Sequence, residues 1–257
     1  MSDDRFAGEF AGKTVIVTGA ASGLGKVTAA AFARSGADVA MVDIDRDGLE
    51  QSVEAVRAEG GSARPILADL SQSDVGSMVI DATVQAFGTI DVLVNVAGVF
   101  HFSPVPQTTA EAWDRVFAIN LRAPFLLCQA ALPHLVERAG AIVNIASSSA
   151  FFGHAYLTAY GASKAALVSL TKSLAMEYAR TPVRINALAP GGMMTPMVSG
   201  MTSMSDGIDR DLVSRYGGLR PPNEPEDLVD LILFLASPRA TAVHGACFAA
   251  DRGITAG

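Results

Sequence analysis

Short apolar runs alternate with longer amphipathic stretches from Thr14 almost to the end of the chain. Seven runs have the length of strands and lack the in/out alternation of a strand with one wet face, which favours strands covered on both sides in a parallel sheet. The seven runs are Thr14–Thr18, Asp38–Val42, Ala63–Leu67, Asp91–Asn95, Ala141–Ile145, Arg184–Ala189 and Ala246–Ala249.

Helical periodicity fills the intervals between these runs. The predicted helices are Gly23–Ser35, Asp47–Glu59, Ser73–Phe87, Ala110–Glu137, Thr158–Arg180 and Glu224–Ala236. Gly36, Gly60, Gly88 and Gly140 follow four of them, as expected of helix stops. This alternation predicts an α/β fold with a doubly wound parallel sheet of seven strands, helices on both faces, and residues 1–257 in a single domain. Segment 196–222 has weak periodicity and is predicted to be a substrate loop or lid.

Composition narrows the class of protein. Half of the residues are hydrophobic, 18% are charged, and the mean hydropathy is +0.33. No window of about 18 residues is apolar throughout, so an oligomer is expected rather than a spanning helix. The net charge of −7 and the pI near 5.0 argue against nucleic acid or anionic membrane as partners. The polar, acidic N-terminus and the two separated cysteines favour a reducing cytoplasmic location.

A glycine-rich turn joins the first predicted strand to the first predicted helix. It comprises Thr18-Gly19-Ala20-Ala21-Ser22-Gly23-Leu24-Gly25. Glycines let the backbone turn tightly and approach a pyrophosphate at the positive end of a helix. A turn of this kind alone is a weak signal, but its place between strand and helix predicts a dinucleotide site.

An aspartate ends the second predicted strand. Asp43 lies 20 residues beyond Gly23, where an acid can accept hydrogen bonds from the adenosine ribose and repel a 2′-phosphate. The alternative is that Asp43, Asp45 and Asp47 only begin the next helix, with Asp45 as its natural cap. Arg46 is a nearby basic residue that could weaken a preference for NAD over NADP. We predict NAD over NADP.

Tyr160 and Lys164 stand four residues apart at the start of a predicted helix, and therefore lie on one face. A tyrosine normally titrates near ~10, and a neighbouring ammonium, reinforced by an oxidised nicotinamide ring, is expected to lower its pKa. Such a pair is usually structural. Here, however, Ser147 follows a strand thirteen residues earlier, at the sheet edge where α/β proteins bind ligands.

With these residues the chain resembles the classical short-chain dehydrogenase/reductase family over nearly its whole length. The resemblance combines the turn Thr18–Gly25, Asn95-Val96-Ala97-Gly98, Asn120, Ser147, Tyr160 with Lys164, and Pro190-Gly191 followed by Thr195. It implies a Rossmann fold, a homotetramer, and hydride transfer between a nicotinamide cofactor and an alcohol/carbonyl pair. Val96, in place of a commoner asparagine, and Arg252, in place of a glycine, depart from the family pattern.

The resemblance also implies a role for each residue. Tyr160 would exchange the substrate proton, Ser147 would bind the substrate oxygen, Lys164 would hold the nicotinamide ribose, and Asn120 would hold a water of the proton relay. Alternatives stay open: Asp69 could be a cap, Asn95 a turn former, and Asn120 the repair of a helix break. The predicted cofactor-binding set is Gly19, Ser22, Gly23, Leu24, Gly25, Asp43, Ile44, Asp69, Leu70, Asn95, Ala97, Gly98, Tyr160, Lys164, Pro190, Gly191, Met193 and Thr195.

The residues expected to face the substrate are largely apolar and predict an apolar alcohol or ketone. They are Phe100, His101, Phe151, Phe152, His154 and Tyr156, with Met193, Met194, Met197, Met201 and Met204 on or beside the lid. The four histidines lack a metal-ligand grouping, and no metal is expected. Two other functions compete: an NADPH-dependent 3-oxoacyl-thioester reductase acting on a carrier protein, and a catalytically silent dinucleotide-binding scaffold.

Overall fold

One parallel sheet of seven strands organises residues 5–193 and 207–256, the part of the chain that the computed structural model describes. The strand order is β3-β2-β1-β4-β5-β6-β7. The strands are β1 (Thr14–Thr18), β2 (Asp38–Asp43), β3 (Ser62–Leu67), β4 (Val92–Asn95), β5 (Ala141–Ile145), β6 (Arg184–Pro190) and β7 (Cys247–Ala250). All seven predicted strands are confirmed, and no strand end differs from its prediction by more than one residue.

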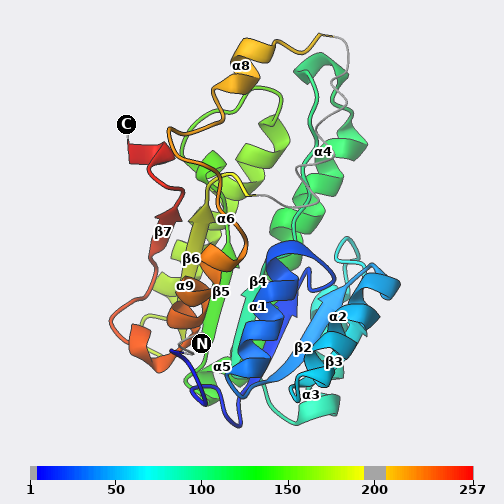
Figure 1. Ribbon diagram of the computed structural model, residues 1–257, viewed down its shortest axis with the longest axis vertical. Coiled ribbons are helices and arrows are strands. Elements are labelled where there is room, and N and C mark those ends of the chain that lie inside the picture. The colour runs from blue at the N-terminus through cyan, green and yellow to red at the C-terminus, as the bar shows by residue number, and fades with distance from the viewer. Residues whose placement is uncertain (1–4, 194–206, 257) are drawn as a thin grey trace.

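Helices cover both faces of this sheet (Figure 1). They are α1 (Gly23–Arg34), α2 (Arg46–Ala58), α3 (Val75–Phe87), α4 (Ala110–Phe117), α5 (Ala123–Glu137), α6 (Thr158–Glu177), α8 (Arg210–Ser214) and α9 (Glu226–Ala236). In β1, Val15 and Val17 belong to the core beneath α1, α2 and α9, whereas Ile16 belongs to the core beneath α3, α5 and α6. Because side chains alternate along a strand, both sets of side chains of a central strand meet a core, so most positions are apolar and the buried polar ones are few. This explains the continuous apolar runs.

The order of the strands reverses between β1 and β4. From β1 the chain proceeds outward to β2 and β3, and then returns through α3 to β4 on the other side of β1. The loops after β1 and β4 therefore diverge at the carboxyl edge of the sheet, which is where doubly wound folds bind ligands.

The edge strands differ from the prediction that every strand is covered on both faces. In β3, four of the six residues are exposed, and no residue of β7 is fully buried. Each of these strands has a neighbour on one side only, so its side chains reach solvent around the rim. The prediction is correct for the central strands and wrong for the edges.

Helix ends follow the predicted glycines with one exception. Gly36, Gly60 and Gly88 have φ values of 94°, 84° and 82°. After α5, however, the left-handed residue is Ala139, with a φ of 51°, and Gly140 is required for another reason. A Cβ on Gly140 would lie 2.4 Å from the carbonyl oxygen of Asp91, so close approach rather than left-handed geometry selects glycine there.

The stretch predicted as one helix, Ala110–Glu137, contains a π-helical segment, Ala118–Arg122, between α4 and α5. An 18-residue window within its 28 residues has a mean hydropathy of 1.4, so the stretch is long and apolar enough to cross a membrane by length and composition alone. However, 56% of the tested window is buried, and α5 contributes Leu127, Cys128 and Leu132 to the core beside α3. This pattern is typical of a core helix, because a spanning helix would present its apolar surface to lipid.

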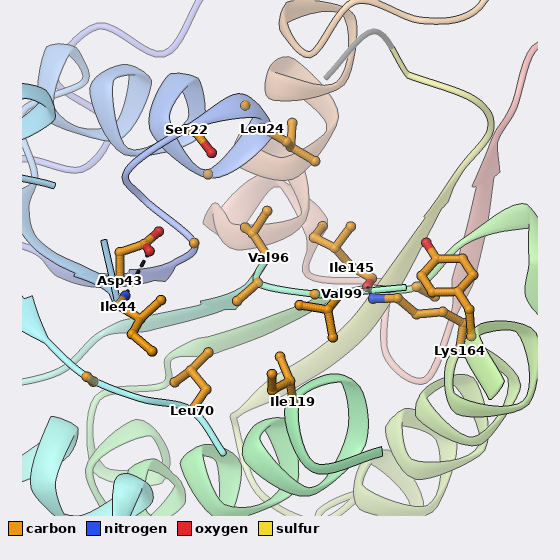
Figure 2. A pocket seen from close by; sticks show the side chains of 18 of the residues that line it. Ser22, Leu24, Asp43, Ile44, Leu70, Val96, Val99, Ile119, Ile145 and Lys164 are labelled. Carbon is orange, nitrogen blue, oxygen red and sulfur yellow. Dashed lines mark hydrogen bonds between the residues drawn. The ribbon is translucent and has the colours of Figure 1, made fainter. Parts of the chain in front are cut away.

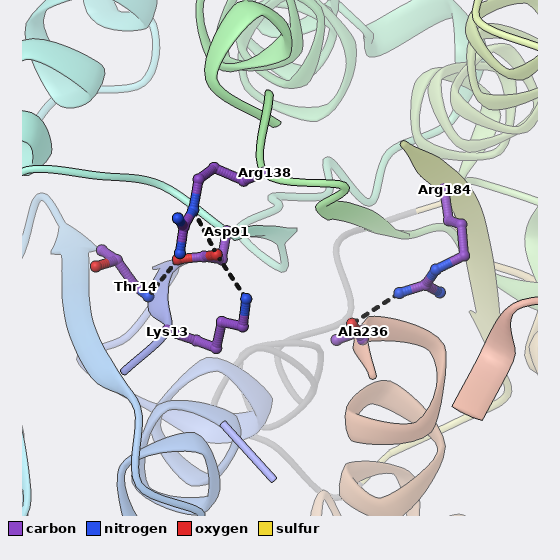
Figure 3. A network of polar contacts seen from close by, with 6 residues as sticks. All are labelled: Lys13, Thr14, Asp91, Arg138, Arg184 and Ala236. Atoms are coloured by element: carbon purple, nitrogen blue, oxygen red, sulfur yellow. Dashed lines mark hydrogen bonds and ion pairs between the residues drawn. The ribbon is translucent and has the colours of Figure 1, made fainter. Parts of the chain in front are cut away.

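At the amino-terminal edge of the sheet, opposite the carboxyl edge, a buried aspartate is paired with two cationic side chains (Figure 3). Asp91, 3% exposed, accepts hydrogen bonds from Lys13 Nζ at 3.1 Å, Arg138 Nε at 3.0 Å and the Thr14 amide at 3.0 Å. A buried charge is tolerated when it has partners of opposite sign and hydrogen bonds. Asp91 therefore joins the start of β1 to the residue that follows α5.

Within the predicted loop 196–222, the structure describes residues 207–222, which include the short helix α8. This part lies above the carboxyl ends of the strands (Figure 1). Its contacts are with the turn before α6: the Asp209 amide donates to the Tyr156 hydroxyl at 2.9 Å, and the Tyr216 hydroxyl donates to the Ala155 carbonyl. The segment is thus docked over the edge of the sheet where the predicted site lies.

Candidate active site

Between β1 and α1 the backbone approaches other loops so closely that side chains would collide. Gly19 has a φ of 72°, and a Cβ there would lie 3.0 Å from the Ala97 Cα. A Cβ on Gly25 would lie 2.0 Å from the Gly19 carbonyl oxygen. The Thr18 hydroxyl accepts hydrogen bonds from the Val96 and Ala97 amides at 3.0 and 3.1 Å, which joins the turn after β1 to the turn after β4. At the start of α1 the backbone N–H groups are therefore not covered by side chains, which is the geometry that binds phosphate groups.

Asp43 is held at the tip of β2 by backbone amides. Its carboxylate accepts hydrogen bonds from Ala21 at 3.0 Å, Ile44 at 2.7 Å and Asp45 at 3.0 Å. Asp45 caps α2 by accepting a hydrogen bond from the Gly48 amide at 3.2 Å, so the capping prediction is confirmed and Asp43 is not the cap. A carboxylate has about four lone-pair positions, and three bonds leave room for a ligand hydroxyl.

Asp69 follows β3 along the same edge. Its carboxylate accepts hydrogen bonds from the Ser71 amide at 2.9 Å and from Gln72 Nε2 at 3.1 Å. These hydrogen bonds, the one from the Ser71 amide foremost, hold the pKa of Asp69 below its usual value, and the nearby charge of Arg115 acts in the same direction. Asp69 and Leu70 thus border the end of the site near Asp43.

A cavity of about 300 Å³ connects the glycine turn with the start of α6. Figure 2 shows Asp43 and Ile44 toward one end, Lys164 at the other, and Val96 and Val99 between them. The predicted cofactor residues that line the cavity are Gly19, Ser22, Gly23, Leu24, Gly25, Asp43, Ile44, Asp69, Leu70, Ala97, Gly98, Tyr160, Lys164 and Met193. An elongated cavity with a bare glycine cradle, a carboxylate at one end and an ammonium at the other fits a dinucleotide.

Three predicted cofactor residues lie behind the cavity wall rather than on it. Asn95 is buried and donates from Nδ2 to Asn144 Oδ1 at 2.8 Å, which links β4 to β5. Pro190 ends β6, and the Gly191 amide donates to the Ala250 carbonyl at 3.2 Å. They support the site through the sheet. Thr195, like Met194, Met197, Met201 and Met204, lies outside the described residues.

Seven lining residues were missed by sequence reasoning: Ala68, Val96, Val99, Arg115, Ile119, Ile145 and Ala146. Five of them adjoin predicted positions or end a strand, so extending each motif by one residue would have found most of them. Arg115 and Ile119 come from α4 and the π-helical segment. No local pattern marks them, because only the packing of that helix over the loop after β4 brings them to the cavity.

Ser147, Tyr160 and Lys164 meet at the end of the cavity near α6. Ser147 caps a short 3₁₀ turn, Ser148–Ala150, after β5 by accepting a hydrogen bond from the Ser149 amide at 3.2 Å, and its side chain is near enough to the Tyr160 phenol to affect the pKa of that group. Lys164 Nζ lies 5.8 Å from the centre of the Tyr160 ring and donates to the Ile145 carbonyl at 2.8 Å. The fold therefore assembles the predicted set of three side chains from two separate elements.

Burial dominates the ionisation of this pair. Desolvation raises the pKa of the Tyr160 phenol, and the hydrogen bond with Ser147 opposes that rise in part. Desolvation also lowers the pKa of Lys164 to about 8. The expectation that Lys164 lowers the pKa of Tyr160 is therefore not met by the protein groups alone, because loss of water penalises both charged forms.

Asn120 occupies the π-helical segment and is fully buried. Its Nδ2 donates to the Val99 carbonyl at 2.8 Å and to Ser163 Oγ at 3.0 Å, and its Oδ1 accepts from the Val99 amide at 2.8 Å. The side chain thus fastens the loop after β4 to α6, and these three bonds do not go to the backbone of its own helix, as the helix-repair alternative would require. A π-helical turn inside a helix is itself frequent at functional sites.

Aromatic side chains contact Tyr160 and His154. The Phe100 ring lies edge to face with the Tyr160 ring at 6.3 Å between centres. Phe152 and Tyr216 each lie 4.4 Å from the His154 ring. Phe151 is 49% exposed and is therefore the least enclosed of the substrate-facing candidates whose positions the structure describes.

Arg252, one of the two departures from the family pattern, has a structural role. Its Nε donates to Asn223 Oδ1 at 2.6 Å, and its guanidinium pairs with Asp227 near the start of α9. In the described part of the chain, no group of three or more His, Cys, Asp and Glu side chains could hold a metal ion.

Comparison with known proteins agrees with this geometry. The family model described as Enoyl-(Acyl carrier protein) reductase matches residues 19–255. The chain is 36% identical to 3beta-hydroxysteroid dehydrogenase 1 of Eggerthella lenta over 95% of its own length and 94% of that protein.

Two solved structures superpose on nearly the whole fold. A Beutenbergia cavernae protein described as an NAD(P) dependent gluconate 5-dehydrogenase, with bound NADP, has a TM-score of 0.87 and 36% identity, covering 98% of this chain and 99% of that one. The 3-ketoacyl-(acyl-carrier-protein) reductase of Brucella melitensis, complexed with NADH, has a TM-score of 0.84 and 31% identity, covering 95% and 99%. The chain belongs to the classical short-chain dehydrogenase/reductase family, a family of oxidoreductases with a Rossmann fold.

Proposed function

We propose that the protein transfers a hydride between NAD(H) and a secondary alcohol/ketone pair, with Tyr160 as the acid/base. The observation that carries this proposal is the meeting of Ser147, Tyr160 and Lys164 at one end of the cavity whose other end holds Asp43. A bound nicotinamide would supply or accept the hydride. Every other requirement is met by side chains of this chain.

Tyr160 exchanges the proton of the substrate oxygen, and Ser147 donates a hydrogen bond to the same oxygen. Desolvation by itself opposes the phenolate, so the positive charge required to favour it comes from Lys164 and from the oxidised cofactor together. Lys164 retains donors beyond its bond to Ile145, and these are available to the nicotinamide ribose. Asn120 positions the loop after β4, and the π-helical backbone around it would hold the water that continues the proton path.

NAD is proposed as the preferred cofactor because the Asp43 carboxylate lines the end of the cavity where the adenosine ribose is proposed to bind. A 2′-phosphate there would meet like charge. Arg46, the residue that could relax this preference, lies 3.9 Å from Glu50 in an exposed ion pair. Relatives with NADP and with NADH are both known, so the ratio of the two catalytic efficiencies has to be measured.

An apolar alcohol or ketone is the proposed substrate class, because the Phe100 ring packs against Tyr160 and the Phe152 ring packs against His154, beside the reacting end of the site. The relative named as a hydroxysteroid dehydrogenase supports this class. The relative named as an acyl-carrier-protein reductase supports the alternative of a 3-oxoacyl thioester. The acidic net charge of −7 weakens that alternative, since an acidic carrier would favour a basic docking surface.

The test is a screen of steroid and alicyclic alcohols, short aliphatic ketones and a 3-oxoacyl thioester, each with NAD(H) and NADP(H), followed by nicotinamide absorbance. Turnover of an uncharged alcohol or ketone with NAD(H) supports the proposal. Turnover of the thioester alone, with NADPH, favours the reductase. Tight NADH binding without turnover of any member favours the catalytically silent scaffold.

A homotetramer and a cytoplasmic location are proposed as well. Trp113 of α4 and Phe125 of α5 are 37% and 40% exposed. A hollow between these two helices and α6 is lined by Phe117, Leu121 and Leu170. Burying this apolar surface between copies would explain the high mean hydropathy. Light scattering coupled to gel filtration measures the mass, and subcellular fractionation of the native host measures the location.

A further inference from the structure

A chain of hydrogen bonds leads from Ser147 away from Tyr160 and ends at an imidazole. The Ser147 and Ser149 hydroxyls are hydrogen-bonded at 3.2 Å, and Ser149 Oγ lies 2.8 Å from His154 Nδ1. Ser147 and Ser149 are 8% and 7% exposed, so water competes little with these bonds. The turn after β5 and the loop before α6 are joined by this chain at the reacting end of the site.

The direction of these bonds decides what Ser147 can do. A hydroxyl has one proton to donate and two lone pairs to accept with. If Ser147 donates to Ser149, its proton is not available to a substrate oxygen. If Ser149 donates to Ser147 instead, the Ser147 proton can turn toward the Tyr160 phenol and the substrate oxygen. The second direction requires His154 to donate to Ser149 from Nδ1.

The surroundings of His154 favour that second direction. Its Nε2 is buried and has no hydrogen-bond partner among the described residues. Phe152 and Tyr216 enclose the ring, and burial lowers the pKa of His154, which keeps the ring neutral near pH 7. A neutral ring carries its proton on one nitrogen only. Either tautomer can bond Ser149, so the difference lies at Nε2, where an unpaired lone pair is tolerated more often than an unpaired N–H.

We propose that Ser149 and His154 are positioning residues: His154 donates from Nδ1 to Ser149, Ser149 donates to Ser147, and the Ser147 proton is thereby directed at the substrate oxygen. No bond to carbon changes and no proton leaves its residue in this arrangement. It rests on the proposed function, because it assigns Ser147 a substrate oxygen to bind. The sequence gives no hint of it, since Ser149 is one of three consecutive serines.

The tautomer can be measured without turnover. Histidine labelled with ¹⁵N gives four imidazole spin systems, and the signals missing from His154→Asn identify His154. The expected spectrum is a neutral ring protonated at Nδ1 from about pH 6.5 to 8. A ring protonated at Nε2 or doubly protonated over that range overturns the proposal. This outcome is independent of whether any substrate is found.

Kinetics then test whether the arrangement matters for reaction. His154→Phe keeps an aromatic ring between Phe152 and Tyr216 but removes the donor, and is expected to lower kcat about 10- to 30-fold with little change in KM for NAD. His154→Asn retains an N–H near the position of Nδ1 and is expected to recover kcat to within about 3-fold of the wild type. Ser149→Ala should match His154→Phe, and the double variant should be no slower than either single one.

Ser148→Ala is the matched control, because Ser148 is a buried neighbour of the same size whose side chain makes no hydrogen bond with residues 5–193 or 207–256. It should leave kcat within about 2-fold of the wild type. Equal losses in His154→Asn and His154→Phe would assign the effect to Nε2 or to packing and overturn the proposal, as would wild-type kcat in Ser149→Ala. Binding of NADH, followed by its fluorescence, confirms that each variant folds.

Discussion

Both edges of the sheet contain a buried charge, and the two charges have opposite surroundings. At the amino-terminal edge, Asp91 is 3% exposed and accepts hydrogen bonds from two cationic side chains and a backbone amide. At the carboxyl edge, Lys164 is also 3% exposed, but its ammonium bonds one carbonyl oxygen and faces a phenol. A satisfied charge stabilises the fold, whereas an under-satisfied charge retains bonding capacity for a ligand.

The largest difference between the two edges should appear when the reacting group is removed. Tyr160→Phe is expected to lower turnover by about 10³-fold, since it cuts the proton path but retains the ring against Phe100. Steady-state kinetics measures the loss, and NADH fluorescence should give a near-normal dissociation constant. Turnover close to that of the wild type would refute the role of Tyr160.

Asp91→Asn probes the opposite edge and should affect stability alone. It removes the charge that pairs with Lys13 and Arg138, while an amide oxygen can still accept from Thr14. The expected loss is about 2 kcal/mol, below the range for fully buried pairs because the two cations are 38% and 43% exposed. Thermal unfolding measures it. An unchanged melting temperature, or weaker NADH binding, would contradict the prediction that Asp91 contributes to stability but not to the cofactor site.

Lys164→Met should raise the free energy of unfolding, whereas Asp91→Asn should lower it. The pKa of Lys164 falls from 10.5 to about 8 on folding, so the unfolded chain binds more protons between those values. The contribution of Lys164 to stability therefore rises with pH from about 8 to 10.5, and its cost is fully present at pH 7. Methionine removes that cost, and we expect a gain of about 1–2 kcal/mol, or a few degrees in Tm.

That gain should shrink above pH 8 and should accompany a large loss of turnover, because the ammonium needed by Tyr160 is gone. Melting curves at pH 7, 9 and 10 measure the trend. A variant that is less stable than the wild type at pH 7 would mean that the bond from Lys164 to Ile145 outweighs desolvation. In that case the buried charge of Lys164, like that of Asp91, would stabilise the fold.

Asp43→Ala should have the smallest effect and concerns cofactor choice. Loss of the carboxylate removes an acceptor for the ribose and the repulsion of a 2′-phosphate, so the ratio of kcat/KM for NAD over NADP should fall about tenfold, equivalent to ~1.4 kcal/mol. The matched control is Asp45→Ala, which removes the cap of α2 but leaves the ribose position intact. An unchanged ratio in Asp43→Ala would refute the ribose role.

Residues with strict backbone requirements were the easiest to predict. Gly19 and Gly25 admit no side chain, so the turn Thr18–Gly25 could be recognised from spacing alone. Largely apolar runs located the central strands, because two covered faces leave few polar positions. The same rule failed at β3, where an edge strand needs only one covered face.

Long-range contacts could not be predicted in the same way. Arg115 and Ile119 reach the cavity because a helix crosses above the loop after β4, and the sequence near them has no corresponding signal. Likewise, nothing in Ser147-Ser148-Ser149 indicates that Ser149 bonds His154. These contacts depend on the angle and depth at which helices and loops meet the sheet.

The sequence by itself determined the strand–helix order, the glycine cradle and the acid after β2, because local spacing and backbone sterics encode each of them, and its resemblance to the family pointed to the Ser-Tyr-Lys set. Tertiary structure alone decided how these groups ionise and which hydrogen bonds they make. The physical reason is desolvation: the pKa of Lys164 and the bonding of His154 depend on how much water the rest of the fold excludes.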